Sequence, residues 1–342
     1  MTNFLFVQTN NPAGNQVLVY ERAATGSLAL AEAVDTGGTG GRLEGSVVDP
    51  LASQGSLVYS SRHRRLVAVN AGSNTVSVLG LDANRLRLRQ VLGSSGAFPV
   101  SATIHGDLLY VLNAREGGSI TGFRLTSDQF VPIQGSTRSL QLDRISGPAE
   151  FVNTPGQISF TPGGQQLVIT TKANGGLIDV FTVGTDGRPS NTFVANSTLT
   201  SIPFGFIFDN YGHLAVTDAG SSSLSTYSVP ADGTVELIAS QSDDGQAMCW
   251  VAQTDGNLYV ADAGSDNLTG YRTDVAGKPT VFTKVETRSG PIDLVATRDG
   301  RFLYLEVGGA GGVDGYRVNR DGTLTQFVSV SGLDGLEGIA AT

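Results

Sequence analysis

The sequence is poor in the residues that carry most covalent and metal chemistry. Its 342 residues include one cysteine, Cys249, and three histidines. A single cysteine excludes an internal disulfide framework and is typical of a reducing compartment. We therefore expect a cytoplasmic protein, with the reservation that a removed signal peptide would leave no trace in this chain.

Charge and long apolar segments are scarce as well. Only 15% of the residues are charged, the net charge is -9, and the basic residues form no extended run. An acidic chain of this kind is not expected to bind nucleic acid or an anionic membrane surface. No segment approaches the roughly 20 apolar residues that a membrane-spanning helix needs, and we expect no membrane partner.

Glycine, in contrast, is abundant, and it punctuates a recurring phrase. Residues 213–229 read HLAVTDAGSSSLSTYSV, and residues 257–272 repeat the pattern as NLYVADAGSDNLTGYR. An earlier copy at 65–81 reads RLVAVNAGSNTVSVLGL. Each copy is an apolar run that ends in Asn or Asp, then a tight turn, then an alternating run. This pattern predicts two antiparallel strands.

The phrase occurs seven times, at intervals of 43 to 61 residues. The residues that end its first strand are Thr9, Asn70, Asn113, Thr171, Asp218, Asp262 and Val307. All-strand repeats of about 40 to 50 residues are typical of propeller blades with four strands each. We predict an all-β fold, a seven-bladed β-propeller with four antiparallel strands per blade, as a single domain over residues 1–342.

The two chain ends carry complementary parts of one blade. The chain begins directly with a second strand, FLFVQTN, and ends with a first strand, EGIAAT. We expect residues 337–342 to supply the innermost strand of the blade that begins at Phe4, because this closes the ring and removes open sheet edges. A closed ring needs no second subunit, and we expect a monomer.

Two insertions lengthen the repeat, at residues 35–53 and 139–153. Both fall between the outermost strand of one blade and the innermost strand of the next, which places them on one face, here called the top. Insertions that share a face of a repeat protein usually mark its binding side, and these are placed to fold over the channel mouth as lids. The alternative is loop variation without function.

Two blades carry motifs that resemble a known family. Residues 155–171 read PGQISFTPGGQQLVITT, and residues 291–309 read PIDLVATRDGRFLYLEVGG. Over essentially the whole chain, this pattern resembles the lactonase-like propellers, which include propeller-type 6-phosphogluconolactonases and carboxymuconate lactonizing enzymes. The resemblance implies acid/base chemistry without a cofactor, as lactone hydrolysis or cyclisation/isomerisation, on a small carboxylate or lactone at the top of the channel.

The fourth blade departs from that family pattern. Where catalytic members carry Arg, His and Glu, this chain has Gly156, Gln157 and Lys172. A glutamine is no general base near neutral pH, and lysine reverses the charge of glutamate. A changed reaction, or none, therefore stays open, and the alternative is a non-catalytic propeller that binds a small molecule or a protein.

The start of each innermost strand predicts which side chains face the channel. Aligned by register, these positions are Ser56, Ser101, Gln157, Gly205, Cys249, Asp293 and Glu337. Asp293 and Glu337 lie on neighbouring blades, where each carboxylate raises the proton affinity of the other and the pair can do acid/base work. We predict these two residues and Gln157, as an oxyanion donor, to be catalytic. The alternative is that the carboxylates accept backbone N–H groups.

Most substrate-binding candidates either differ in residue type from the equivalent positions of the other blades or stand at the end of a blade's second strand. Lys172 and Arg115 stand where other blades have small residues, and together they form a candidate clamp for a carboxylate. Their alternative is local surface ion pairing. Glu306 is a carboxylate in a column of mostly apolar or small residues. The remaining candidates are Trp250, Asn113, Asp218 and Asp262, the last three of which an Asx turn also explains.

The three histidines, His63, His105 and His213, all fall in turns on the opposite, bottom face. There they cannot assemble a histidine metal site or a nucleophile relay at the top. We therefore expect no histidine-bound metal and no cofactor, while a cation held only by oxygen ligands stays open.

Overall fold

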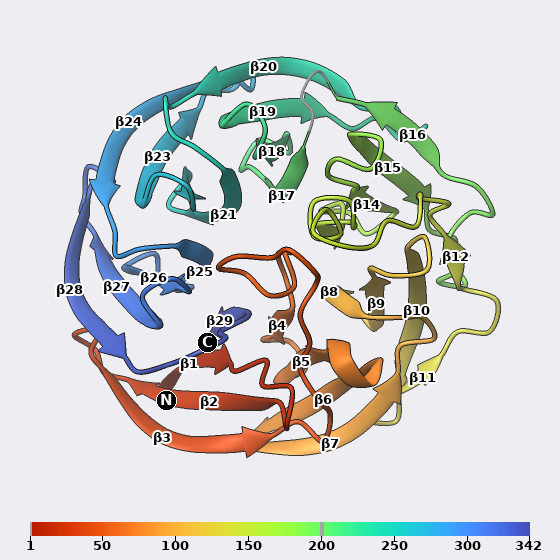
Figure 1. Cartoon of the computed structure of the whole chain (residues 1–342), viewed down its shortest axis with the longest axis horizontal. Helices are drawn as coiled ribbons and strands as arrows, with labels where there is room; N and C mark the ends of the chain where they lie inside the picture. Colours follow the sequence, from red (N-terminus) through yellow and green to blue (C-terminus); the bar gives the residue numbers. More distant parts are fainter. Residues whose placement is uncertain (1, 199–201) are drawn as a thin grey trace.

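The computed structural model, which describes residues 2–198 and 202–342, consists of seven antiparallel sheets arranged around one axis (Figure 1). The predicted seven-bladed propeller is confirmed. The sheets are numbered here as blades 1 to 7 along the chain, and their strands are given from the innermost to the outermost.

Blades 1 to 4 follow the four-strand pattern. Blade 1 contains β29 (Ile339–Ala341), β1 (Asn3–Gln8), β2 (Gln16–Arg22) and β3 (Leu28–Asp35). Blade 2 contains β4 (Leu57–Ser60), β5 (Arg65–Asn70), β6 (Thr75–Asp82) and β7 (Arg85–Gly93). Blade 3 contains β8 (Pro99–His105), β9 (Leu108–Asn113), β10 (Ser119–Thr126) and β11 (Gln129–Pro132), with β12 (Arg138–Ser139) also on β10. Blade 4 contains β13 (Gln157–Phe160), β14 (Gln166–Thr170), β15 (Leu177–Thr182) and β16 (Val194–Ser197).

Blades 5 to 7 repeat the same order. Blade 5 contains β17 (Pro203–Phe208), β18 (Leu214–Asp218), β19 (Ser223–Ser228) and β20 (Glu236–Ser242). Blade 6 contains β21 (Met248–Thr254), β22 (Asn257–Asp262), β23 (Asn267–Thr273) and β24 (Pro279–Glu286). Blade 7 contains β25 (Pro291–Ala296), β26 (Phe302–Val307), β27 (Gly312–Val318) and β28 (Leu324–Ser331). The one helix among the described residues is a single 3-10 turn, Ala71–Ser73, and none is long and apolar enough to cross a membrane.

Burial follows the position of each strand in its blade. The second strand of blade 2, RLVAVN, is buried along nearly its whole length, because neighbouring blades pack on both of its faces. The outermost strand of the same blade, RLRLRQVLG, is mostly exposed and carries three arginines. Charged side chains on such an outer edge disfavour pairing with another chain.

The two chain ends meet in blade 1. Strand β29 pairs antiparallel with β1, with Leu5 opposite Ala341, Phe6 opposite Ala340 and Val7 opposite Ile339. The predicted ring closure by the C-terminal strand is therefore confirmed.

Deleting residues 337–342 is expected to destabilise the ring strongly. The deletion removes the buried Ile339 and exposes the inner edge of β1, whose Phe6 and Val7 are fully buried. Losing one such aliphatic side chain costs about 1.5 to 3 kcal/mol, and the lost strand pairing adds to this. We expect the free energy of unfolding in urea to fall by about 3 kcal/mol or more. Unchanged unfolding of the truncated chain, relative to a Thr342→Ala control, would show that blade 1 is held by other contacts.

Candidate functional site

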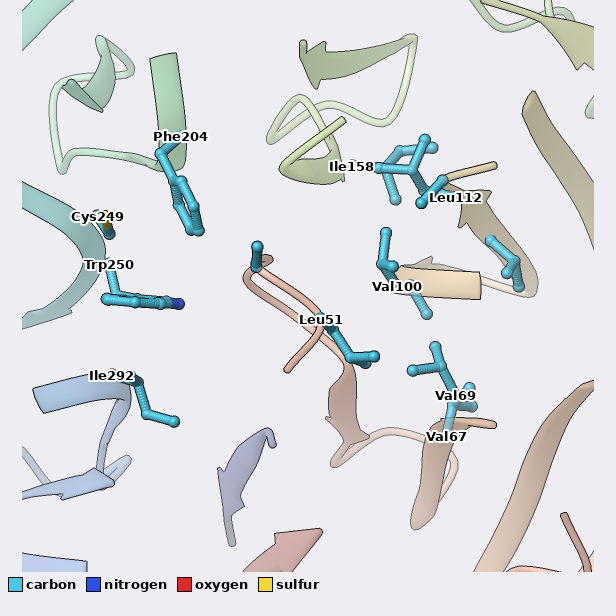
Figure 2. Packing of buried hydrophobic residues seen from close by; sticks show 14 of the residues in the cluster. Leu51, Val67, Val69, Val100, Leu112, Ile158, Phe204, Cys249, Trp250 and Ile292 are labelled. Carbon is cyan, nitrogen blue, oxygen red and sulfur yellow. The ribbon is translucent and has the colours of Figure 1, made fainter. Parts of the chain in front are cut away.

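The first insertion runs into the centre of the ring from the top face. Residues 49–54, here called the central strap, lie on the propeller axis between the innermost strands (Figure 1). Leu51 and Ala52 of the strap are buried. Figure 2 shows Leu51 surrounded by side chains from several blades, among them Val100, Phe204, Trp250 and Ile292. The channel mouth is thus filled by the chain itself.

Asp49 shapes the start of the central strap. Its Oδ1 accepts the N–H groups of Leu51 (2.9 Å) and Ala52 (2.7 Å), and its Oδ2 accepts the N–H of Ser53 (3.0 Å). A short carboxylate that bonds the backbone two to four residues ahead stabilises a turn. This turn directs the chain back across the axis.

The end of the strap crosses from blade 2 to the opposite blades. The backbone N–H of Gln54 donates to the carbonyl of Gly156 in blade 4 (3.1 Å). The Gln54 amide pairs with the backbone of Val251 in blade 6, donating to its carbonyl (2.8 Å) and accepting its N–H (3.0 Å). Trp250 Nε1 donates to the carbonyl of Ser53 (2.9 Å). Trp250, a predicted substrate-binding residue, therefore anchors the strap through this hydrogen bond.

Lys172 lies beneath the strap with its side chain buried, only 1% exposed. Its ammonium donates to the carbonyls of Ala52 (2.6 Å) and Phe151 and to the Thr154 hydroxyl (3.1 Å). Burial lowers the pKa of Lys172 to about 7, against the opposing effect of carboxylates such as Asp49. All three N–H donors of the ammonium are therefore taken by the protein, and the side chain does not face an open mouth.

The two predicted catalytic carboxylates are both buried at the mouth. Glu337 Oε2 accepts the N–H of Leu51 (3.0 Å), and burial, followed by the charge of Asp49, raises its pKa well above the usual range. Burial also raises the pKa of Asp293 to about 7, while its Oδ1 accepts the N–H of Leu294 (2.9 Å). Raised pKa values were expected, but from mutual repulsion. Burial is the main cause, and the charge that raises both pKa values most is that of Asp49.

Glu306 belongs to the same buried group. Its Oε2 accepts the N–H of Gly338 (3.1 Å), and its Oε1 has no hydrogen-bond partner among the described residues. Burial, followed by the charge of Asp293, raises the pKa of Glu306 well above its usual range. The hydrogen bond with Gly338 ties blade 7 to the closing segment before β29.

Gln157 and Arg115 hold parts of the protein together. The Gln157 amide accepts the N–H of Phe206 (2.7 Å) and donates to its carbonyl (3.1 Å), which joins blade 4 to blade 5. Arg115 binds both carboxylate oxygens of Glu150 from the second insertion, at 2.6 and 3.0 Å, and lies over the Phe98 ring. Lys172 and Arg115 do not form the predicted clamp, because each is engaged by an insertion.

The strand-end candidates bond locally. Asp218 accepts the N–H of Ser221 (2.7 Å) in a turn, as in the local turn that the sequence analysis gave as the alternative to substrate binding. Asn113 donates weakly to Ser94 O and Ser119 Oγ, both at 3.3 Å. Burial raises the pKa of Asp262 to about 8, aided by a hydrogen bond with Asp243. No group of three or more His, Cys, Asp or Glu residues in the described part of the chain is arranged to hold a metal ion.

Sequence reasoning missed the residues that build the strap, Asp49 and Gln54, and the lysine partner Thr154. These residues lie in or beside the insertions, outside the repeat that aligned the other candidates. The one available signal was the Asp49-Pro50 pair in a glycine-rich insertion, which favours a turn.

Two cavities remain near the axis. A top hollow of about 260 Å³ lies between blade 3 and the second insertion, lined by Arg115, Arg144, Asn153 and Thr154 among others. A smaller space of about 210 Å³ lies against the innermost strands and is lined by Gln54, Gln157 and Asp293 among others. The top hollow is thus the open space beside the closed mouth.

No protein-family model matches the chain, and no curated protein matches it in sequence. Solved structures match its fold over the whole length. The periplasmic gluconolactonase from Pseudomonas aeruginosa is 15% identical with a TM-score of 0.80, covering 100% of this chain and 99% of that chain. A "putative 6-phosphogluconolactonase" from Bacteroides fragilis is 17% identical with a TM-score of 0.79, covering 99% and 98%. A hypothetical selenium-binding protein from Sulfolobus tokodaii is 12% identical with a TM-score of 0.70, covering 100% and 93%.

At these identities the likeness concerns the fold. The names of the three neighbours also differ in function, in keeping with the many unrelated activities that propellers support. The chain is a seven-bladed β-propeller with the fold of the lactonase-like propellers.

Proposed function

We propose that this propeller binds a small carboxylated molecule in the top hollow and does not catalyse a reaction of it. The observation that supports the non-catalytic part is the state of Lys172, whose three N–H donors are all used on Ala52, Phe151 and Thr154. A substrate that entered the mouth would have to displace the central strap and its hydrogen bonds.

The top hollow offers a cation that a ligand can take over. Among the described residues, the ion-pair partner of Arg144, which is 73% exposed, is the exposed Glu116, at 2.7 Å between Nη1 and Oε2. Exposed pairs of this kind contribute about 1 kcal/mol or less, so a ligand carboxylate competes easily for the guanidinium. Asp143 and Glu150 also line the hollow. Asn153 and Thr154 place polar side chains on the wall of the hollow. A volume of about 260 Å³ suits a small metabolite.

The second candidate is an enzyme of the lactonase-like group that acts on a lactone or carboxylate at the mouth. Its support is Asp293, whose pKa burial raises to about 7, together with the raised pKa of Glu337. A carboxyl that titrates near neutral pH is suited to general acid/base catalysis. This candidate requires the central strap to leave the mouth during turnover.

One experiment separates the two candidates and tests the binding site. Wild type is assayed for turnover of sugar lactones and muconolactone-type acids, and we expect no rate above the uncatalysed background. Turnover that disappears in Asp293→Asn would overturn the non-catalytic proposal. The same compounds and simple mono- and dicarboxylates are then screened by thermal shift. We expect at least one acid to raise the melting temperature of wild type but not of Arg144→Gln.

The matched control is Arg320→Gln, which removes an exposed arginine in a bottom-face turn outside both hollows. This variant should respond to the acids as wild type does. If no acid stabilises wild type, or if Arg144→Gln responds equally, the top hollow is not the binding site.

A further inference from the structure

One cavity lies on the bottom face, away from the top hollow and the central strap. It has a volume of about 740 Å³ and is formed where blades 7, 1 and 2 meet. Its charged side chains are Arg22, Arg64, Arg298 and Asp299, and Thr342, the last residue of the sequence, also lines it. We call this cavity the seam hollow.

The seam hollow is positively charged within an acidic protein. Three arginines face one aspartate there, although the chain as a whole carries a net charge of -9. The arginines are at positions 22, 64 and 298, far apart in the sequence, so they do not form a basic segment. Guanidinium groups gathered in a concave site attract oxyanions and bind them with paired hydrogen bonds.

Arg22 is buried in the wall with an incomplete set of partners. Its side chain is 3% exposed, and its Nε has no hydrogen-bond partner among the described residues. Its ion pair with Asp299 is long, at 4.0 Å, and the guanidinium also lies over the Phe302 ring at 5.6 Å. A buried cation with so little compensation is costly unless another anion completes its shell.

Asp299 already accepts hydrogen bonds from two residues outside the arginine group of the hollow. Its Oδ1 accepts the hydroxyl of Thr297 (2.6 Å) and the N–H of Arg301 (3.2 Å). Although burial acts the other way, these hydrogen bonds and the nearby arginines hold the pKa of Asp299 below its usual value. One carboxylate in this position cannot neutralise three arginines.

The other two arginines are arranged to receive a ligand. Arg64 is held in place because its Nε and Nη2 donate to the carbonyls of Leu81 and Ala83, both at 3.0 Å. Arg298 is exposed and makes no hydrogen bond or ion pair within the described residues, so that it is free to close on a bound anion. Because Arg64 is already fixed, its side chain loses little conformational entropy when a ligand binds.

We propose that the seam hollow binds a small organic dianion, a phosphate monoester or a dicarboxylate. A ligand with two anionic groups can bond Arg64 and Arg298 at the same time. Tyr59 and Asn84 on the wall supply polar groups for the rest of the ligand. Because the hollow and its charges lie on the opposite face from the mouth, the proposal holds whether or not the mouth is catalytic.

The test is calorimetric titration of the full chain at low salt with inorganic phosphate, glycerol 3-phosphate, succinate and acetate. We expect glycerol 3-phosphate or succinate to bind with a Kd below about 1 mM, acetate at least tenfold more weakly, and added salt to weaken binding. Arg298→Gln, an exposed position that should leave folding unchanged, is expected to raise the Kd at least tenfold. Arg64→Gln should act in the same direction.

The matched control is Arg320→Gln, an exposed arginine outside both hollows, which should bind these anions as wild type does. Binding of inorganic phosphate equal to that of glycerol 3-phosphate would show that the site takes the bare ion, and it would overturn the organic ligand. The seam hollow would be excluded if no anion binds, or if Arg298→Gln and Arg320→Gln have the same affinity. Loss of acid binding in Arg144→Gln alone would concern only the top hollow.

Discussion

Replacing Lys172 by methionine is expected to lower the free energy of unfolding by about 3 to 5 kcal/mol. Methionine fills a similar volume but donates no hydrogen bond, so the buried carbonyls of Ala52 and Phe151 lose their donor. A buried polar group left without a partner costs about 1 to 3 kcal/mol, and two such groups account for the expected loss. Urea unfolding followed by circular dichroism measures it.

The control for this prediction is Lys278→Met, which changes an exposed lysine on the bottom face. This variant should stay within about 0.5 kcal/mol of wild type. If Lys172→Met were equally mild, the central strap would not depend on the lysine, and the main support for a closed, non-catalytic mouth would be lost.

Stability is expected to decrease as the pH rises from 5 to 7, by about 2 kcal/mol from Asp293, with Glu306 and Glu337 adding to the decrease. Burial raises the pKa of Asp293 to about 7 and the pKa of Glu306 and Glu337 well above the usual range. The folded protein therefore holds protons that the unfolded chain, with carboxyl pKa values near 4, has released. The stabilisation is complete below about pH 4 and is lost as the pH rises through the folded pKa values, at up to about 1.4 kcal/mol per pH unit for each carboxyl.

The titration of Lys172 changes stability in the opposite direction, raising it as the pH rises, but it does so at higher pH than the carboxyls. Its folded pKa of about 7 lies below the unfolded value near 10.4, so it is protonated in both states at pH 5 and changes stability only above neutral pH. Urea unfolding at pH 5, 6 and 7 measures the slope. Asp293→Asn, which mimics the protonated acid, should make the slope shallower, because the other buried carboxyls remain, and should exceed wild type in stability at pH 7. A pH-independent wild type would contradict the prediction.

The repeat made the fold predictable at the level of individual strands. Asn70, Asp218 and Asp262 end equivalent strands because each blade is one structural unit with the same turn after its second strand. The ring closure by residues 337–342 followed from the same alignment, since a first strand at one chain end complements a missing one at the other. The insertions were also expected at the mouth, and the first of them does enter it.

The environment of each candidate residue was not predictable in this way. Alignment placed Lys172, Gln157 and Glu337 at the top of the channel, where the structure has them. It could not indicate that an ammonium there would bond Ala52, or that a carboxylate would accept the N–H of Leu51, because residues 49–54 have no counterpart in the repeat.

The sequence by itself determined the seven blades, the closure of the ring and the face that carries the insertions. These features depend on periodic local patterns, which each blade repeats independently. Only the tertiary structure decided that the central strap closes the mouth and that Arg22, Arg64 and Arg298 meet around the seam hollow. Those contacts join residues far apart in the chain. Their geometry depends on how blades pack around the axis, for which a linear pattern carries no signal.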